Sequence, residues 1–159
     1  MIAIIDYGVG NLFSLKCSFK AIGEDALVTS DAEAIRGAER IILPGVGAFA
    51  DAAQKLRDSG MEQCVLEEAA KGKPLLGICL GMQLLLDSSE EYGHHRGLGL
   101  IPGENRSIAG VIPEGWKIPR MGWNSLAFPG GKHPLFRYID EGDFVYFVHS
   151  FAGFDCEES

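Results

Sequence analysis

The sequence predicts an α/β fold, with an open, mostly parallel sheet, helices on both faces and antiparallel edge strands in the second half. Short unbroken apolar runs such as Ile2 to Ile5 are typical of strands that are buried on both faces. Segments with apolar residues at helical spacing lie between these runs. This alternation of strands and helices favours parallel pairing through right-handed crossovers.

The first half of the chain reads as repeated strand and helix units. After the plausible N-cap Asn11, apolar residues recur at helical spacing at Leu15, Phe19 and Ile22, and Gly23 ends the helix. In chain order, we expect strands at 2–5, 26–29, 40–43 and 74–78, a short helix capped by Ser30 or Asp31, and longer helices at 12–22, 49–59 and 61–70.

The second half has a different character. Residues 87–110 are rich in glycine and polar residues and show no sustained helical period. Strands are expected at 125–128 and 144–149, where Val, Tyr and Phe gather. A chain of 159 residues without a linker or repeat is expected to bury one core, so we expect a single domain over 1–159.

The charge balance argues against two classes of partner. The formal net charge is -8 and the sequence pI is about 4.9, so the average surface repels a phosphate backbone and nucleic acid is not expected. No apolar run approaches the ~20 residues of a membrane-spanning helix, and the first residues do not resemble a secretory signal. We expect a cytoplasmic protein that does not bind membranes.

The spacing of the four cysteines fits neither a disulfide framework nor a pair of metal-binding thiols. Cys17 and Cys64 occupy apolar positions of helical patterns and are expected to be small buried residues. Cys156 lies in a polar segment that carries no pattern. Cys79 therefore becomes the cysteine of interest.

Cys79 lies between Gly77 and Gly81, directly after a predicted strand and before a helical pattern. This layout is typical of a nucleophile elbow, a tight turn that exposes the nucleophile and needs glycines where a Cβ atom would clash. Free N–H groups at a helix start favour a thiolate. The plain alternative is a small residue in a tight strand–helix junction.

A second glycine-rich segment, LPGVG at 43–47, ends the preceding predicted strand. Ligands of open parallel sheets bind beyond the carboxyl ends of the strands, so both segments should border one crevice. Backbone N–H groups of this loop, together with that of Leu80, could then form an oxyanion hole for Cys79. Gln83, at i+4 from Cys79, could hold a polar substrate. The plain alternative for the loop is an ordinary glycine-rich turn.

These motifs resemble those of the class I (triad type) glutamine amidotransferases, whose fold is flavodoxin-like. The matching segments span nearly the whole chain and are closest to the glutaminase subunits of imidazole glycerol phosphate synthases. They are DYGVGN at 6–11, PGVGAF at 44–49, GICLGMQLL at 77–85, PRMGWN at 119–124 and FVHS at 147–150.

The resemblance implies a chemistry and a partner. Cys79 would attack the side-chain amide of L-glutamine, form a thioester and release ammonia to a (β/α)₈-barrel cyclase of histidine biosynthesis, in a heterodimer that needs no cofactor and no metal. It implies an oxyanion hole from Val46, Gly47 and Leu80. It implies substrate binding by Gly45, Gln83, His149, Ser150 and Phe151, the last in place of the family's usual Tyr. It implies a partner interface at Asn11, Arg120, Met121, Gly122, Trp123 and Asn124.

The family supplies its general base from a late H-P-E-K-type segment, which is not found in these 159 residues. His94 and His95 are expected in a polar loop, His133 in a structural HPLF turn, and His149 on the substrate side. We therefore expect a C-terminally incomplete amidotransferase domain that hydrolyses glutamine slowly and self-associates.

Two alternatives stay open at this point. The chain could be the glutaminase subunit of another synthase, such as anthranilate or aminodeoxychorismate synthase, although Met82 and PRMGWN argue against this. It could also be a catalytically silent subunit that binds or regulates the cyclase.

Overall fold

The computed structural model describes residues 1–156, which form two compact units. The first unit contains Met1–Arg106 and the segment that starts at Gly153, and the second contains Ser107–Ala152. The expectation of one domain over 1–159 stays a prediction.

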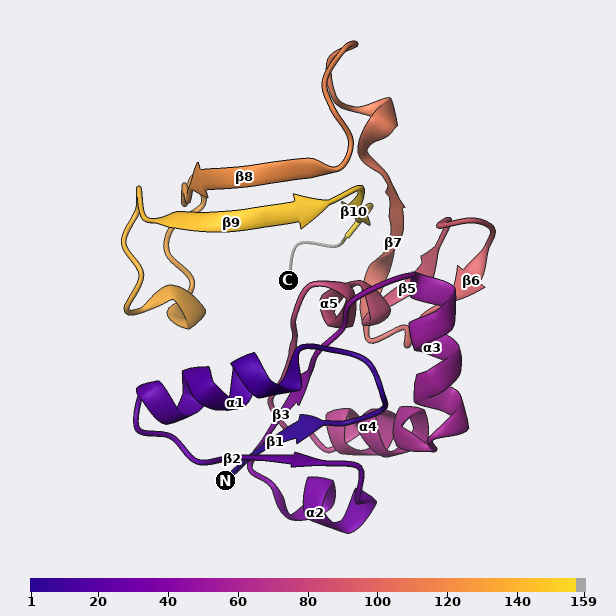
Figure 1. Cartoon of the computed structure of the whole chain (residues 1–159), viewed down its shortest axis with the longest axis vertical. Coiled ribbons are helices and arrows are strands. Elements are labelled where there is room, and N and C mark those ends of the chain that lie inside the picture. The colour runs from indigo at the N-terminus through magenta and orange to yellow at the C-terminus, as the bar shows by residue number, and fades with distance from the viewer. Residues whose placement is uncertain (157–159) are drawn as a thin grey trace. The chain divides into compact units, whose positions relative to one another are not determined.

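A parallel four-stranded sheet forms the centre of the first unit (Figure 1). Its strands are β1 (Ile2–Ile5), β2 (Ala26–Thr29), β3 (Arg40–Leu43) and β4 (Leu75–Gly77), in the order β2-β1-β3-β4. β1 is buried along its whole length, as expected of a central strand with helices on both faces. The predicted parallel sheet is confirmed.

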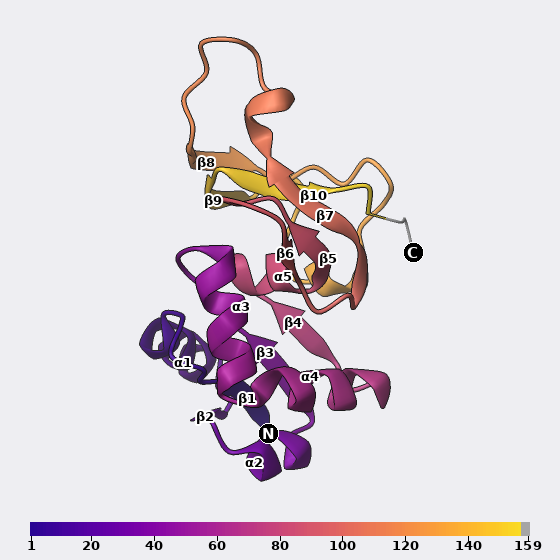
Figure 2. The same cartoon turned by 90° about the vertical axis from the view of Figure 1, so that its right-hand side faces the viewer.

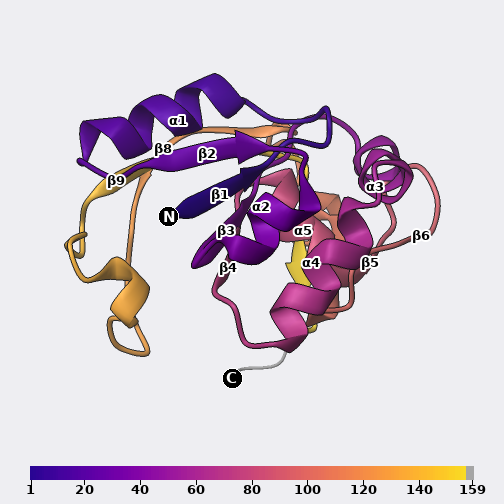
Figure 3. The ribbon, with the colours of Figure 1, turned by 90° about the horizontal axis from the view of Figure 1, so that it is seen from below.

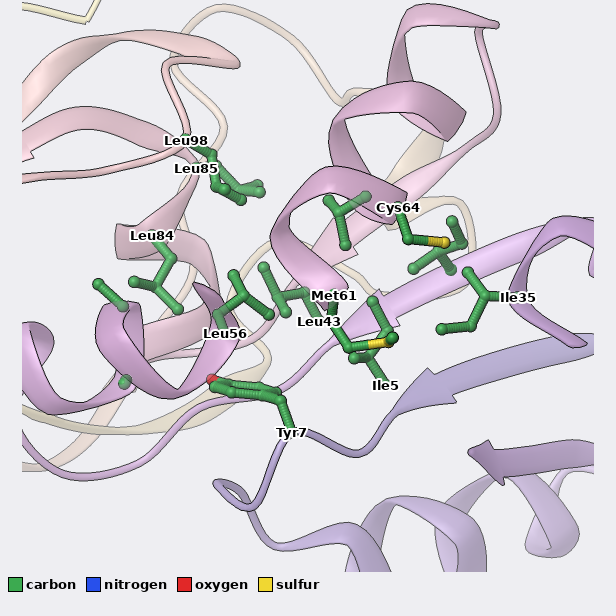
Figure 4. Packing of buried hydrophobic residues seen from close by; sticks show 14 of the residues in the cluster. Ile5, Tyr7, Ile35, Leu43, Leu56, Met61, Cys64, Leu84, Leu85 and Leu98 are labelled. Carbon is green, nitrogen blue, oxygen red and sulfur yellow. The ribbon is translucent and has the colours of Figure 1, made fainter. Parts of the chain in front are cut away.

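Helices cover both faces of this sheet, with α1 on one face and the others opposite (Figure 3). Because successive side chains of a strand point to opposite faces, β1 contributes to two cores. Ile2 and Ile4 pack with the α1 residues Leu12, Leu15 and Phe19. Ala3 and Ile5 belong to the core on the other face, where Figure 4 shows Ile5. The helices are α1 (Leu12–Ala21), α2 (Ala32–Gly37), α3 (Phe49–Asp58) and α4 (Met61–Ala70).

Local sequence signals explain where the first helices begin and end. The Asn11 side chain accepts a hydrogen bond from the Ser14 N–H at 3.2 Å and caps α1. Asp31 caps α2 by accepting from the Glu33 N–H at 3.0 Å, which decides between the two expected caps. Gly23 has a φ of +79° just after α1, as a helix stop requires.

One prediction about the cysteines is wrong. Cys64 on α4 is buried, as expected, but Cys17 on α1 is exposed. The face of α1 that contacts the sheet carries Leu12, Leu15 and Phe19. Cys17 is two residues from Leu15, or about 200° around the helix, and therefore points away from the sheet.

The glycine-rich part of the first unit contains strands that the sequence did not reveal. After α5 (Leu80–Leu84), a second sheet has the order β10-β7-β5-β6 (Figure 2). The pairing of β5 with β6 is antiparallel, whereas that of β5 with β7 is parallel. The strands are β5 (Leu86–Ser89), β6 (His95–Arg96), β7 (Ile101–Ser107) and β10 (Phe151–Phe154).

The second unit is built around an antiparallel pair, β8 (Arg120–Ser125) and β9 (Phe144–His149), with short 3₁₀ turns η1 (Ile108–Gly110) and η2 (Pro134–Phe136). Trp123 and Tyr146 lie opposite each other in this pair, with ring centroids 5.5 Å apart. The strand predicted at 144–149 is confirmed.

The strand predicted at 125–128 is wrong, because β8 ends at Ser125. Regular pairing ends there. The Leu126 N–H still donates to the Asp143 carbonyl at 2.8 Å and the Gly142 N–H donates to the Leu126 carbonyl at 2.9 Å, but residues 126–128 form no strand, and a turn follows at 129–130. Across residues 1–156, we find no helix with the length and apolar character needed to cross a lipid bilayer.

Candidate active site

Three loops meet at the carboxyl end of the parallel sheet. The Tyr7 hydroxyl, just beyond β1, donates a hydrogen bond to the carbonyl oxygen of Pro44, just beyond β3, at 2.7 Å. The Ile78 N–H, just beyond β4, donates to the carbonyl oxygen of Leu43 at 3.0 Å. The three loops therefore lie together, as predicted, at the end of the sheet where ligands of open α/β folds bind. That they border a crevice stays a prediction.

Cys79 has the backbone conformation of a nucleophile elbow. Its φ is 54° and its ψ is -117°, a combination that residues other than glycine rarely adopt and that costs of order 1–3 kcal/mol. Cys79 is exposed and serves as the N-cap of α5. Its carbonyl accepts from the N–H groups of Met82 and Gln83 at 3.0 and 3.2 Å, which ties the turn to the helix.

Close backbone packing explains each glycine around Cys79. A Cβ atom on Gly77 would lie 2.5 Å from the Met82 Cα, and one on Gly81 would collide with the carbonyl oxygen of Leu43. A Cβ atom on Gly45 would lie 2.6 Å from the backbone N of Gly81. The loop after β3 is therefore pressed directly against the backbone of the elbow.

The middle of the 44–48 loop is open, whereas both of its ends are fastened. Val46 is 54% exposed, and Gly47 has a φ of +95° with nothing near the position of a Cβ atom. Tyr7 holds the first end, as described above. At the other end, the Phe49 N–H donates to the Glu91 carboxylate at 2.7 Å.

Glu91 is a site neighbour that sequence reasoning missed. It lies in the polar DSSEEYG stretch, 42 residues from its hydrogen-bond partner Phe49, and no spacing connects the two. Its carboxylate accepts from the first N–H of α3, a position where a negative charge is favoured. Glu91 thus fixes the point at which the 44–48 loop becomes a helix.

Gln83 differs from Cys79 in exposure, since only 9% of Gln83 is accessible. It belongs to α5, which has five residues, so the predicted helix is shorter than the apolar run suggested. Of the predicted site residues, Gly45 lies against Leu80, which directly follows Cys79, and against Gly81.

The remaining substrate-side predictions fall at the end of the second unit. His149 closes β9, and its Nδ1 atom lies 3.0 Å from the Phe151 carbonyl oxygen. The Ser150 carbonyl accepts from the Ile108 N–H at 3.0 Å. Of the predicted partner-facing residues, Asn11 caps α1 in the first unit, whereas Arg120, Met121, Gly122, Trp123 and Asn124 lie on β8 in the second.

The other histidines have the following surroundings. His133 Nδ1 accepts from the Leu135 N–H at 3.1 Å and caps η2, which confirms the predicted structural turn. His94 is exposed in a loop, as expected. His95 was expected in the same loop but starts β6, because Ser89 of β5 pairs with it.

The Tyr7 hydroxyl, which holds the 44–48 loop, is affected by burial. Tyr7 is 5% exposed, and burial raises the pKa of its hydroxyl well above the ordinary value of 10.0. The hydroxyl therefore stays protonated and available as a donor at neutral pH. Over residues 1–156, no group of three or more His, Cys, Asp and Glu side chains is arranged to hold a metal ion.

The chain combines a parallel α/β sheet with an exposed, strained cysteine directly after the fourth strand, beside a glycine-rich loop. These features define an α/β protein with a cysteine at a nucleophile elbow. Comparison with known families agrees with this description. The family model "Glutamine amidotransferase class-I" matches residues 3–157, and the chain belongs to this enzyme family.

Similar proteins point to one subfamily. The chain is 48% identical over 152 residues to a protein of Sulfurimonas denitrificans, covering 95% of this chain and 72% of the relative. It is 47% identical over 159 residues to one of Oceanobacillus iheyensis, covering 100% and 77%. Both relatives are named "Imidazole glycerol phosphate synthase subunit HisH", which confirms the resemblance seen in the motifs.

A solved structure supports the fold. The chain in "Crystal structure of glutamine amidotransferase" superposes with a TM-score of 0.64 at 21% identity, covering 79% of this chain and 64% of that chain. The predicted α/β class is confirmed. The chain spans about two thirds of that solved chain and about three quarters of the two relatives named above.

Proposed function

We propose that this chain is the glutaminase subunit of an imidazole glycerol phosphate synthase, which hydrolyses L-glutamine and passes the ammonia to a cyclase subunit. One observation carries the proposal. Gly45 packs against the backbone of Leu80 and Gly81, the two residues after Cys79, so the glycine loop lies against the turn that carries this exposed cysteine.

The proposed reaction begins at the Cys79 sulfur. The thiolate forms a bond to the side-chain amide carbon of glutamine, and the carbonyl oxygen becomes an oxyanion. The C–N bond then breaks, and the nitrogen leaves as ammonia after it receives a proton from a general acid. Water attacks the resulting thioester, which yields glutamate and restores the thiol. In this family, the acid and base are one histidine of a late H-P-E-K-type segment, oriented by an acidic residue. That segment is not found in these 159 residues, so we expect the proton transfers to be slow in this chain.

Backbone donors would stabilise the oxyanion. The N–H groups of Val46, Gly47 and Leu80 are the proposed donors, and one donor of this kind is worth ~10²–10³ in rate. The fixed loop and the strained turn hold these groups before the substrate arrives, so little reorganisation is needed during the reaction. This explains why the chain tolerates an unfavourable φ at Cys79.

The proposed substrate-binding residues are Gly45 and Gln83 in the first unit and His149 to Phe151 in the second. The proposed cyclase-facing residues are Asn11 in the first unit and Arg120 to Asn124 in the second. Both assignments rest on the family motifs at these positions. The names of the relatives, which call each one a subunit of the synthase, support a heterodimer with a cyclase.

The test measures glutamate formed from glutamine by the purified chain in the presence of the (β/α)₈-barrel cyclase. Replacing the nucleophile in Cys79→Ser should lower the rate to the background without protein, whereas Cys17→Ser, which changes another exposed thiol, should leave it unchanged. Equal rates for the chain and Cys79→Ser would contradict the proposal and favour a binding or regulatory subunit. Activity with a chorismate-using synthase instead of the cyclase would favour the other glutaminase assignment.

A further inference from the structure

Tyr7 is a buried aromatic residue for which the proposed reaction has no direct use. Its ring belongs to the larger core of the first unit and lies among buried side chains that include Leu43 and Leu56 (Figure 4). The hydrophobic contribution of this position could be made equally by phenylalanine. The hydroxyl group therefore needs a separate explanation.

The hydroxyl has one buried partner, the carbonyl oxygen of Pro44, at 2.7 Å. This carbonyl belongs to the peptide that joins Pro44 to Gly45, so the hydrogen bond fixes the orientation of that peptide plane. The Val46 N–H is attached to the carbonyl carbon of Gly45, on the next peptide. A rotation of the first plane would consequently move the first proposed oxyanion donor.

The surroundings make this region sensitive to such a rotation. Gly45 is already closer to the Gly81 backbone than any residue with a Cβ atom could be. Gly10, three residues after Tyr7, approaches Pro44 from the same loop, where an added Cβ would lie 2.9 Å from the Pro44 Cβ. The far end of the loop is fastened separately by the Glu91 carboxylate at the Phe49 N–H.

We infer that Tyr7 is a positioning residue, whose hydroxyl holds the Pro44–Gly45 peptide so that the following N–H groups point at the carbonyl that Cys79 attacks. This inference rests on the proposed glutaminase function. A protonated tyrosine is required as the donor, and burial, which raises the pKa of Tyr7, keeps its hydroxyl protonated into the alkaline range.

Two electrophiles with different requirements test the inference on the whole chain. A chloroketone analogue of L-glutamine passes through an oxyanion at its ketone before the sulfur displaces chloride, so it needs the loop. Iodoacetamide alkylates the same sulfur by direct displacement of iodide and needs no oxyanion donor. The measured quantities are the maximal inactivation rate and half-saturating concentration for the chloroketone, and the second-order rate for iodoacetamide at Cys79.

Tyr7→Phe should lower the maximal chloroketone rate roughly tenfold, less than the loss of a donor itself, because the residue acts through the loop. The half-saturating concentration and the iodoacetamide rate should stay within about twofold, since the thiol and the side-chain contacts of the substrate are unchanged. Tyr138→Phe makes the same atomic change at a tyrosine that is 89% exposed and should alter none of these values.

A stability control separates positioning from general loosening. Lys73→Met removes hydrogen bonds to two α2 carbonyl groups at the opposite end of the sheet and should lower the melting temperature without lowering the chloroketone rate. An unchanged chloroketone rate in Tyr7→Phe, or an equal decrease in Lys73→Met, would overturn the inference. A wild-type chain in which the chloroketone shows no saturation would instead overturn the proposed function, and the role of Tyr7 with it.

Discussion

The two ends of the parallel sheet in the first unit use polar groups in opposite ways. At the amino end, the Glu68 side chain is 3% exposed and forms ion pairs with Lys71 and Lys73, both at 2.6 Å. Lys73 also donates to the carbonyl oxygens of Ile35 and Arg36, at 3.0 and 2.7 Å. Each charge here is satisfied by a neighbouring group, so the network holds α2, α4 and the start of β4 together.

At the carboxyl end, the important polar groups belong to the backbone. Cys79 is exposed and strained, Val46 is exposed, and the glycines beside them serve close approach rather than core packing. Paired charges at the amino end of the sheet stabilise the fold. At the carboxyl end, the strained backbone lowers stability but holds the site groups in a preformed arrangement. Such strain is typical of functional sites.

The largest expected effect on stability comes from adding a methyl group where the turn around Cys79 packs against the end of β3. Gly81→Ala would push a methyl group into the carbonyl oxygen of Leu43 and should lower the free energy of unfolding by about 3 kcal/mol or more. Chemical denaturation measures this. Gly37→Ala is the matched control, because open space surrounds Gly37, and its stability should change by less than about 1 kcal/mol. Equal stability of the two variants would refute the close packing.

The next effect concerns chemistry rather than folding. Val46→Pro removes the N–H that is the proposed oxyanion donor and should slow inactivation by the glutamine chloroketone ~100-fold. Val46→Ala keeps that N–H and truncates only an exposed side chain, so it should react at nearly the original rate. A proline variant that reacts as fast as the alanine variant would remove Val46 from the oxyanion hole.

A smaller effect is expected from the amino end. Lys73→Met removes one of the two ion pairs of Glu68 and the side-chain hydrogen bonds to two carbonyl groups of α2, which should lower the melting temperature by about 5 °C. Lys55→Met is the control, since Lys55 is about half exposed and its ion pair with Asp51 spans 3.6 Å. The account of the amino end fails if both variants melt at the same temperature.

The smallest effect is a pH dependence. Hydrogen bonds from Lys71 and then Lys73 hold the pKa of Glu68 below its ordinary value of 4.5. Because the folded state favours the charged carboxylate, this stabilisation is complete above about pH 4.5 and is lost as the pH falls through the lower folded pKa. Unfolding free energies measured from pH 7 downwards should decrease less steeply for Glu68→Gln than for the original chain. Parallel curves would contradict this.

Sequence patterns predicted those parts that depend on neighbours along the chain. Asn11 caps the start of α1 and Gly23 follows its end, and both are local signals. The glycines around Cys79 predicted the elbow, because such a turn admits few other residues. Contacts between distant residues gave no signal. The hydrogen bonds from Tyr7 to Pro44 and from Phe49 to Glu91 join segments 37 and 42 residues apart.

The polar strands escaped prediction for a different reason. Ser88 and Ser89 of β5 and Asn105 of β7 are buried, although their side chains are polar. The Asn105 amide donates to the Ser89 hydroxyl at 2.9 Å, whereas Ser88 Oγ and Asn105 Oδ1 are buried without a hydrogen-bond partner among residues 1–156. A pattern based on apolar residues reads such a stretch as a loop.

The most direct test of the central claim maps which thiol reacts with the chloroketone analogue of L-glutamine. Peptide mass spectrometry would follow Cys17, Cys64, Cys79 and Cys156 over time, with and without excess glutamine. We predict saturable modification at Cys79 that glutamine slows, while the exposed Cys17 and Cys156 react only at the rate of an ordinary thiol. Equal labelling of the three exposed cysteines, without protection by glutamine, would contradict the account.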